Sequence, residues 1–359
     1  MTTNNLYLDI HVIQTVPSSN INRDDTGAPK TALYGGVSRS RVSSQSWKRA
    51  VRQSFQDDTV TVGYRTKKAA QLLKDALQKL TPDLSDDDAW EQVNAVFKAA
   101  SVKLDKNEET SALLMLSSGQ IDQLAQYVKD NADGELDKKA IKAVLKGNQS
   151  IDLALFGRMV ADNPELNVEA AAQVAHAIST HEVVPEFDYF TALDDLQPDD
   201  TTGAAMLGTL EFNSATLYRY ANINMNDLIA NLGEAAAVDG AREFVKAFVL
   251  SMPTGKQNTF ANKTLPSYVM LTLRTDTPVN LVSGFEDPVT SKQGYVKQSI
   301  EKLNAAYKQT LQFVEKPVLN VALGADASAI AVPAENLTAL LGQVTTELTK
   351  VVKDENGND

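Results

Sequence analysis

Apolar and polar residues alternate in the segment LYLDIHVIQTV (Leu6–Val16) near the start of the chain. Because successive side chains of a strand point to opposite sides, an alternating segment has one apolar face. That face consists of Leu6, Leu8, Ile10 and Val12. The alternation predicts a β-strand that is buried on one side only, with His11 on the other side.

A helical pattern begins near Ser43. Ser43 or Ser44 can cap the first N–H groups of a helix, and apolar residues then recur every four positions, at Trp47, Val51 and Phe55. This spacing predicts an amphipathic helix whose apolar stripe faces the core. Basic residues lie off that stripe, at Lys48, Arg49 and Arg52.

From about residue 67 to residue 181 the periodicity remains helical. Thr81-Pro82 would end the first helix, and a capping box from Ser85 to Asp88 would begin the second. We expect helices in the stretches 67–80, 85–97, 110–130, 137–146, 150–160 and 168–179. No fixed period relates these stretches, which indicates a helical insertion rather than a repeat array.

Strand character returns in TLEFNSATLYRYANIN (Thr209–Asn224). The polar segment 195–208 precedes it, and together they predict a long protruding β-arm. Further along, we expect a helix around 241–250, a polar loop (PTGKQNTFANK, 253–263), a strand (268–275) and a helix over 295–313. This order predicts an α+β fold, with a ferredoxin-like core interrupted by insertions.

Charge is distributed unevenly along the chain. The 359 residues include 34 Lys and Arg against 46 Asp and Glu, a formal net charge of −12. The segment from Arg23 to Arg52 reverses this balance, because its only acidic residues are Asp24 and Asp25. Its basic residues are Arg23, Lys30, Arg39, Arg41, Lys48, Arg49 and Arg52. The asymmetry predicts one anion-binding surface on a body that otherwise repels anions.

Composition also restricts the chemistry. The chain has no cysteine, which excludes disulfides and thiolate nucleophiles and is typical of a reducing cytoplasm. No apolar run is long enough to cross a membrane, and the N-terminal residues lack the basic start of a signal peptide. We therefore expect a cytoplasmic protein with no membrane partner.

The histidines, His11, His176 and His181, are the first candidates for acid–base or metal chemistry. His176 and His181 are too badly spaced for joint metal binding on a helix, and packing is the simpler interpretation of His11. Asp24-Asp25 could hold Mg²⁺, but such a pair more often orders a turn. The phosphate-loop, dinucleotide and hydrolase motifs are missing. We expect structural histidines, no catalytic site and no cofactor.

The basic segment has two interpretations. Its side chains can simply solvate a helix face, or they can surround a bound anion. Like charges four residues apart, such as Lys48 and Arg52, destabilise a helix unless an anion compensates them, and a helix N-terminus suits phosphate. Lys256-Gln257-Asn258 offers a second polar surface of this kind. Tyr189-Phe190 can pack against a neighbour or stack on a base.

A longer pattern runs through the first fifty residues: N-R-D-D, then G-G, then R-x-S-S-Q-S-x-K-R-A. The segments GRM (157–159), AHAISTHEV (175–183), DYFTALDDLQ (188–197), LGTLEF (207–212), YRYANINM (218–225) and GKQNTFA (255–261) follow in order. The sequence resembles the CasC-type backbone subunit of type I-E CRISPR Cascade, a member of the RAMP superfamily. The resemblance covers most of the chain and is weakest over 66–145 and beyond residue 276.

The resemblance implies an RRM-like palm (1–65 and 225–359), helical fingers (66–185) and a β-arm thumb (186–224). Copies would polymerise head to tail along one guide RNA (crRNA) as a helical filament, with other Cascade subunits, and the guide would pair with target DNA. The RNA-binding residues would be Arg23, Lys30, Arg41, Ser43, Gln45, Lys48, Arg49, Arg52, Met159, Tyr189, Phe190, Lys256, Gln257 and Asn258.

The implied function is a non-catalytic, crRNA-binding subunit of an antiviral DNA surveillance complex. Met159, Tyr189 and Phe190 would be its apolar contacts near a kink in the guide, and the role of Arg39 stays open. The alternative is a metal-dependent RAMP ribonuclease that cleaves bound RNA through an aspartate of the Asp24-Asp25 pair. In a second version of that alternative, His11 would act as a general base.

Overall fold

The computed structural model describes residues 5–57, 62–132, 134, 136–160, 162–192 and 206–356. The chain forms two compact units. The sheet unit comprises residues 1–51, 174–222 and 244–347, and the helical unit comprises residues 52–173, 223–243 and 348–359. Among the described residues, no helix combines the length and the apolar character that crossing a membrane requires.

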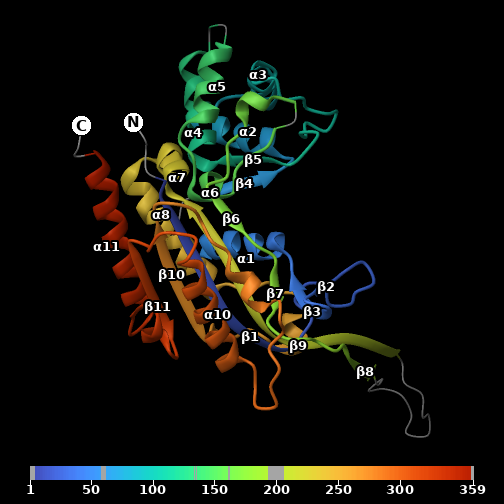
Figure 1. The fold of residues 1–359 in the computed structure, drawn as a ribbon. Coiled ribbons are helices and arrows are strands. Elements are labelled where there is room, and N and C mark those ends of the chain that lie inside the picture. Colours follow the sequence, from blue (N-terminus) through green and yellow to red (C-terminus); the bar gives the residue numbers. More distant parts are fainter. Residues whose placement is uncertain are drawn as a thin grey trace, which may run out of the picture. The chain divides into compact units, whose positions relative to one another are not determined.

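A single path of hydrogen-bonded strands forms the core of the sheet unit (Figure 1). Within it, β1 runs antiparallel to β10, with Ile10 opposite Leu271, and β7 runs antiparallel to β9. The strands follow one another in the order β12 (Val332–Pro333), β11 (Leu319–Gly324), β10 (Tyr268–Arg274), β1 (Tyr7–Ser19), β9 (Met206–Asn224), β7 (Ala177–Ser179), β3 (Val37–Val42) and β2 (Thr31–Tyr34).

Four of these strands and two helices have the βαββαβ order of a ferredoxin-like fold. Along the chain, α1 (Ser44–Asp57) comes between β1 and β7, and α8 (Glu234–Leu250) comes between β9 and β10. In the sheet, β1 lies between β10 and β9, so the first core strand is flanked by the fourth and the third. The predicted α+β class is confirmed, and this strand order is consistent with an RRM-like palm.

Both faces of the sheet are covered around β1. On β9, the side chain of Arg219 points to one side of the sheet, and those of its neighbours Tyr218 and Tyr220 point to the other side. On one side, the rings of Trp47 (α1) and Phe248 (α8) lie 6.5 Å apart, and the Arg219 guanidinium lies 3.7 Å from the Trp47 ring centroid. On the other side, α10 (Val296–Thr310) and η2 (Leu281–Phe285) pack on the tyrosines Tyr218, Tyr220 and Tyr268.

This double cover contradicts the expected half-buried strand. Residues 8–14 of β1 are all buried, polar ones included. The alternation in the sequence is real, but the polar members of the row, Asp9 and His11, are enclosed by α10, η2 and the tyrosines instead of facing water. An alternating strand is half-exposed only when one face of its sheet stays open.

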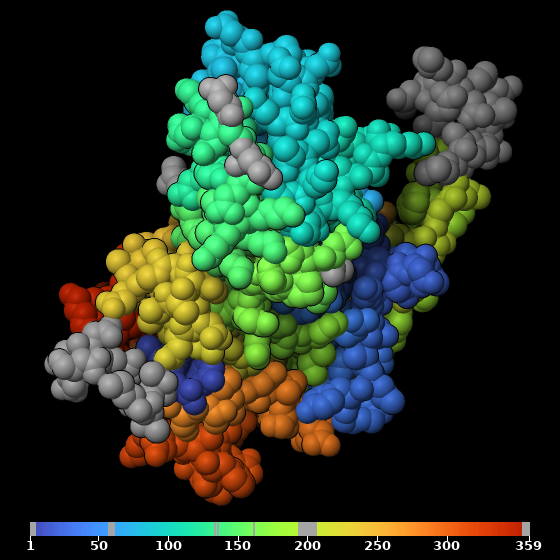
Figure 2. Space-filling model, turned by 90° about the horizontal axis from the view of Figure 1, so that it is seen from above, coloured from blue at the N-terminus to red at the C-terminus, as the bar shows by residue number. Residues whose placement is uncertain are grey.

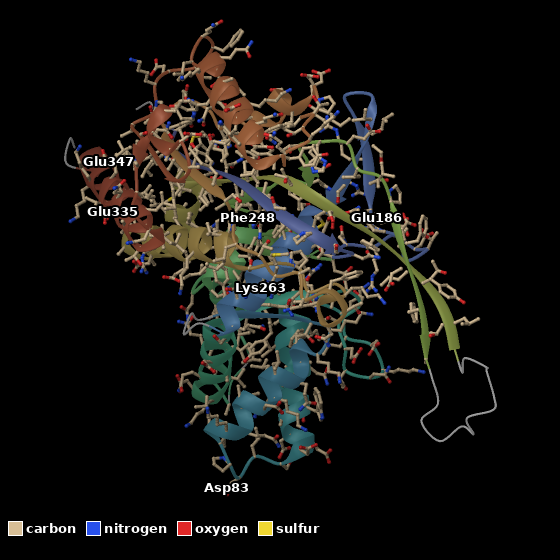
Figure 3. All side chains as sticks on the ribbon, turned by 90° about the horizontal axis from the view of Figure 1, so that it is seen from below. Asp83, Glu186, Phe248, Lys263, Glu335 and Glu347 are labelled. Carbon is tan, nitrogen blue, oxygen red and sulfur yellow. The ribbon has the colours of Figure 1, made fainter. Side chains whose placement is uncertain are left out.

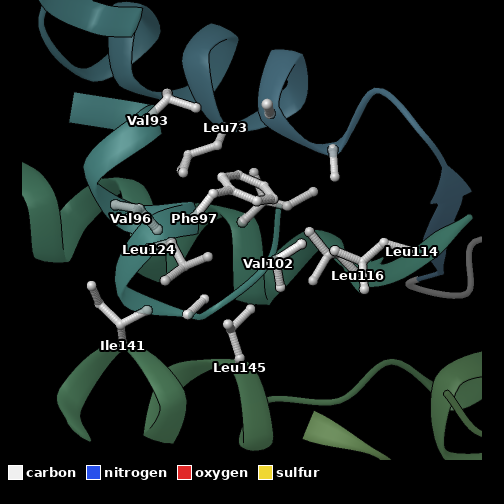
Figure 4. Packing of buried hydrophobic residues seen from close by; sticks show 14 of the residues in the cluster. Leu73, Val93, Val96, Phe97, Val102, Leu114, Leu116, Leu124, Ile141 and Leu145 are labelled. Atoms are coloured by element: carbon white, nitrogen blue, oxygen red, sulfur yellow. The ribbon is translucent and has the colours of Figure 1, made fainter. Parts of the chain in front are cut away.

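The helical unit has an apolar core of its own (Figure 4). α2 (Ala69–Leu80) packs against α3 (Asp86–Ala99) and α4 (Ser118–Asp130), and α4 packs against α5 (Lys138–Lys146). Figure 4 shows Leu73, Phe97 and Leu124 directed toward one another from these helices. Ser85 caps α3, because its Oγ accepts the Asp88 N–H at 3.2 Å, but Asp88 Oδ2 accepts the Ser85 hydroxyl at 2.7 Å, so only one half of the expected capping box is made.

Three expected helices differ from the structure. The stretch 110–130 begins as β5 (Leu114–Ser117), which pairs with β4 (Gly63–Thr66). The stretch 168–179 holds β6 (Ala172–Val174) and β7 and no helix. Its alanines fit both periodicities, and pairing with distant strands decides the outcome. The stretch 150–160 is helical only in α6 (Ile151–Phe156), because Gly157 turns the chain away with φ of 74°.

The two units have limits that differ from the expected palm and fingers. Residues 52–65 and 223–243 belong to the helical unit, and residues 174–185 belong to the sheet unit. The expected β-arm is present, because β8 (Glu186–Ala192) pairs along β9; residues 195–205 of its expected tip lie outside the described residues. The remaining elements are η1 (Pro164–Leu166), α7 (Met225–Leu232), α9 (Gln257–Phe260), η3 (Ala327–Ala329) and α11 (Leu337–Asn356).

Candidate nucleic-acid interface

Asp24 orders the loop that carries Arg23. Its Oδ1 accepts hydrogen bonds from the Thr26 N–H (2.9 Å), the Thr26 hydroxyl (2.7 Å) and the Ala28 N–H (3.1 Å). These bonds, with the Thr26 hydroxyl foremost, lower the pKa of the Asp24 carboxyl. Arg23 and Asp25 are exposed on the same loop. Asp24 therefore stabilises a turn, which is the common role of aspartate in a loop.

Hydrogen bonds attach this loop to β3 and to the residue before α1. The Lys30 N–H donates to the Asn22 carbonyl at 2.9 Å, and the Arg41 N–H donates to the Lys30 carbonyl at 2.8 Å. The Ser43 N–H donates to Asn22 Oδ1 at 2.8 Å. Four predicted RNA-binding residues, Arg23, Lys30, Arg41 and Ser43, are thus held in one region of the sheet unit.

His176, for which a structural role is expected, lies at this region too. Arg41 Nη1 is 3.2 Å from His176 Nδ1, and Arg41 Nε donates to the Thr31 carbonyl at 3.0 Å. Burial, followed by the positive charges of Arg41 and Lys30, lowers the pKa of His176. The side chain is nevertheless exposed, and His176 lies just before strand β7 and not in a helix.

Arg39, whose role the sequence left open, is buried in the sheet unit. Its Nη1 donates to the Ser179 carbonyl at 2.9 Å, and its Nη2 donates to the Phe285 carbonyl at 2.8 Å. A third bond runs from Nε to the Tyr34 carbonyl at 3.1 Å. Arg39 therefore joins β2, β7 and the end of η2, and it is not available to a ligand.

Helix α1 has the predicted faces. Its apolar stripe of Trp47, Val51 and Phe55 is fully buried. Gln45 and Arg49 are exposed, and Lys48 is half-buried, which lowers the pKa of its amine.

Arg52 has a partner within the helical unit. Its Nε lies 3.2 Å from Asp152 Oδ2, and the Asp152 side chain is only 1% exposed. Asp152 also accepts a hydrogen bond from the Gly63 N–H at 2.8 Å. The repulsion between Lys48 and Arg52 on α1 was expected to require a bound anion. The carboxylate of Asp152 offsets part of that repulsion. RNA binding by Arg52 stays a prediction.

The loop before α9 lies against the loop that carries Arg23. A Cβ at Gly255 would be 2.4 Å from the Ile21 carbonyl oxygen, so only glycine allows the two backbones to approach this closely. Lys256 follows in the left-handed region, with φ of 51°. Gln257 is half-buried and Asn258 is exposed. The two polar surfaces predicted separately from the sequence are therefore neighbours.

The β8–β9 arm presents aromatic side chains. Every residue of β8 is exposed, and Figure 3 shows the side chains of the arm directed away from both faces, beginning at Glu186. Tyr189 and Phe190 point to opposite faces and are 65% and 40% exposed. Phe190 lies over Gly208 of β9, where a Cβ would be 2.4 Å from the ring.

The base of the arm is tied to the N-terminal loop. Asn20 Nδ2 donates to the Gly27 carbonyl and to the Glu211 carbonyl, at 2.9 Å in both cases. Figure 2 shows this blue loop beside the yellow-green arm. The basic loop and the aromatic arm are therefore parts of one continuous surface of the sheet unit.

In the helical unit, the segment Gly157–Met159 displays a methionine. Gly157 is required by its positive φ and by a close contact, since a Cβ would be 2.7 Å from the Val168 carbonyl oxygen. Arg158 is buried and donates to the Leu145 carbonyl (2.7 Å) and the Leu166 carbonyl (2.8 Å). Burial lowers the pKa of Arg158 to about 10. Met159, held by this buried neighbour, is 82% exposed.

The other two histidines pack inside the sheet unit, as expected. His11 is buried, with its Nδ1 2.9 Å from the Tyr218 hydroxyl. His181 stacks on Tyr295 with ring centroids 3.6 Å apart, and its Nε2 accepts the Thr216 N–H at 3.0 Å. In the part of the chain that the structure describes, no group of three or more His, Asp or Glu side chains could hold a metal ion.

The fold and this surface define a class: an α+β protein with a ferredoxin-like strand order, a helical insertion and a β-arm. The family of CT1975-like proteins matches residues 8–349, and the chain belongs to that family. Together with the solved structures that follow, this match confirms the resemblance to CasC-type subunits of Cascade.

Two solved structures are similar to the chain over almost its whole length. One is a chain described as "CRISPR RNA-guided surveillance complex, pre-nicking", with 32% identity and a TM-score of 0.84, covering 95% of this chain and 100% of that one. Another is a chain described as "CRISPR RNA-guided surveillance complex", with 29% identity and a TM-score of 0.76, covering 95% and 99%. No curated protein matches the sequence significantly.

Proposed function

We propose that this chain is the guide-RNA-binding backbone subunit of an RNA-guided DNA surveillance complex. The observation that carries the proposal is the contact between two loops at Gly255 and Ile21. It supports a shared surface, because Gly255 precedes Lys256 and Ile21 lies two residues before Arg23. Lys, Arg and Gln side chains suit a phosphate backbone, whereas the Ser43 side chain is buried. The similar solved structures are described as RNA-guided complexes.

The position of the RNA follows from which surfaces are covered. Many RRM domains stack bases on aromatic side chains of the open sheet face. Here Tyr218 and Tyr220 of that face lie beneath α10 and η2. The guide would therefore follow the loops at the rim of the sheet, with phosphates held by basic side chains. Tyr189 and Phe190 on the arm would make apolar contacts with bases.

Assembly would repeat this site along the strand. Copies would bind one crRNA head to tail, beside other Cascade subunits in the cytoplasm, and the bases left exposed would pair with target DNA. Each copy needs only a few phosphate contacts, because the copies add up along the guide. The acidic exterior would limit binding to other polyanions.

We also propose that the subunit is not catalytic. Asp24, the first candidate for a metal ligand, already accepts three hydrogen bonds that order its loop. His11, the candidate general base, is 2% exposed. These two assignments weaken the ribonuclease alternative.

The test replaces Lys48 and Arg49 together by alanine in the full chain. Removing two phosphate contacts should weaken binding to single-stranded RNA and lower the slope of log K against log salt by roughly 1.4, about 0.7 for each contact. Fluorescence anisotropy over a range of salt concentrations measures both quantities.

A matched control removes the same charge from another part of the sheet unit. Lys297→Ala with Lys308→Ala changes two exposed lysines of α10, which covers the sheet and is not part of the proposed surface. This control should bind RNA with the affinity and salt slope of the wild type. Equal losses in both double variants, or no loss in either, would contradict the proposed surface.

A further inference from the structure

Arg41 and His176 make a contact that fixes the proton of the histidine. Arg41 Nη1 is 3.2 Å from His176 Nδ1. A guanidinium has only donors, so Nδ1 must accept, and the neutral imidazole then carries its proton on Nε2. The exposed side of His176 therefore presents an N–H donor.

The guanidinium of Arg41 is itself held in place. Its Nε donates to the Thr31 carbonyl at 3.0 Å, and its main-chain N–H donates to the Lys30 carbonyl at 2.8 Å. Arg41 is also opposite Ile178 in the β3–β7 ladder, two residues after His176. Among the described residues, no protein acceptor takes the Nη2 donors of Arg41. Two fixed groups thus offer unused donors at one place.

We propose that Arg41 and His176 form one pair that binds the RNA backbone, in which His176 orients the guanidinium through Nδ1 and donates to a neighbouring oxygen of the RNA backbone through Nε2. This inference rests on the proposed function, because it names a further residue of the same RNA site. His176 is then both a positioning residue for Arg41 and a direct contact.

The pair combines one charged and one neutral donor. The charged groups that face His176 are Arg41 on β3 and Lys30 in the loop before β2, and both are cations. Together with partial burial they lower the pKa of His176, so the ring is neutral near pH 7.5. A neutral donor adds affinity without releasing counterions, which separates its effect from that of a charged side chain.

The experiment compares His176→Ala and Arg41→Ala in the full chain, with a single-stranded RNA of guide length at pH 7.5. Arg41→Ala should weaken binding and lower the salt slope by about 0.7. His176→Ala should weaken binding on the order of tenfold at every salt concentration and leave the slope unchanged. Thermal unfolding of both variants, compared with that of the wild type, verifies that each substitution leaves the protein folded.

Two conservative variants separate the halves of the role. His176→Asn keeps an acceptor near the position of Nδ1, and His176→Gln keeps a donor near the position of Nε2. Each should recover part of the affinity lost in His176→Ala. The double variant Arg41→Ala with His176→Ala should lose less than the two single losses combined, because the two residues act as a unit.

The outcomes distinguish this inference from the proposed function. If Arg41→Ala weakens binding and His176→Ala binds like the wild type, the pair is wrong and the RNA surface stands. If neither variant changes binding, the proposed function fails with it. A lower salt slope in His176→Ala would also overturn the pair, because the ring would then carry a charge.

Discussion

Burial shifts the pKa values of two side chains on β1 in opposite directions. Asp9 accepts hydrogen bonds from the Tyr220 hydroxyl (2.7 Å) and the Val279 N–H (3.0 Å). Burial nevertheless dominates and raises its pKa from 3.8 to about 6. Burial also lowers the pKa of His11 from 6.5 to about 3. Between about pH 4 and pH 6 the folded chain binds a proton at Asp9 that the unfolded chain binds at His11.

The signs of these two contributions are opposite. A raised carboxyl pKa adds stability that is fully present below pH 3.8 and is lost as the pH rises through about 6. A lowered histidine pKa adds stability that is present above pH 6.5 and is lost as the pH falls toward 3. The two groups therefore nearly cancel between pH 4 and pH 6.

Asp9→Asn should remove this cancellation. Relative to the wild type, the free energy of unfolding of the variant should decrease by about 1.4 kcal/mol for each unit by which the pH is lowered from 6 to 4. Urea titrations at pH 6, 5 and 4 measure the difference. Asp25→Ala, a change at an exposed carboxylate, is the control and should track the wild type. A gap between Asp9→Asn and the wild type that does not vary with pH would contradict the opposing shifts.

Single residues also show where sequence reasoning stops. Arg39 and Arg41 are two positions apart in the same basic segment, yet one is buried among carbonyl groups and the other is half-exposed. The carbonyls of Ser179 and Phe285 accept hydrogen bonds from Arg39, but both residues are far from Arg39 in the sequence. Their approach to Arg39 could therefore not be predicted from the sequence. Charge alone therefore cannot tell a structural arginine from a binding one.

The arm is the element with the clearest local design. Phe190 covers Gly208 across the β8–β9 pair, and a ring over a glycine is a stable cross-strand arrangement. Any side chain at position 208 would displace the ring from this position.

Gly208→Val should therefore reorient Phe190 while the sheet unit stays folded. We expect weaker assembly on guide RNA with a change in thermal stability of less than about 1 kcal/mol, since cross-strand pairs contribute roughly 0.2–1 kcal/mol. Phe187→Ser removes an exposed apolar side chain of the same strand and is the matched control. Normal RNA assembly by Gly208→Val would show that the position of Phe190 is unimportant.

Elements were predictable where local periodicity is strong. The helices α1 to α3, the first strand and the arm follow from their apolar spacing and caps. The structure of the stretch 168–179 was not predictable, because alanine-rich segments fit helix and strand alike. Only the pairing with β3 and β9 makes β7 a strand. The same error hid the position of His176 beside Arg41, which follows from the pairing of β7 with β3.

At the scale of the whole molecule, charge governs association. A formal net charge of −12 makes copies repel one another. An RNA strand can overcome this repulsion by binding the basic surface of each copy. The proposed head-to-tail contacts would continue along the strand as an open filament if their rotation does not close a ring.

The number of bound copies should therefore rise in single steps with RNA length. Mass photometry of the full chain with single-stranded RNAs of increasing length would resolve the steps, and the protein without RNA is the control. One constant mass for all lengths would indicate a closed oligomer and would contradict the filament.

The pairing of β1 with β10 has a consequence for biosynthesis. Tyr7 is opposite Arg274, and β9, the other neighbour of β1, begins only at Met206. At about 5–20 residues per second, the ribosome needs roughly 9–37 s to pass from the end of β1 at Ser19 to the start of β9 at Met206. Throughout that interval an apolar strand has neither of its partners and can pair with other nascent chains. The strand at the centre of the finished sheet is therefore the one that a cell must protect for longest.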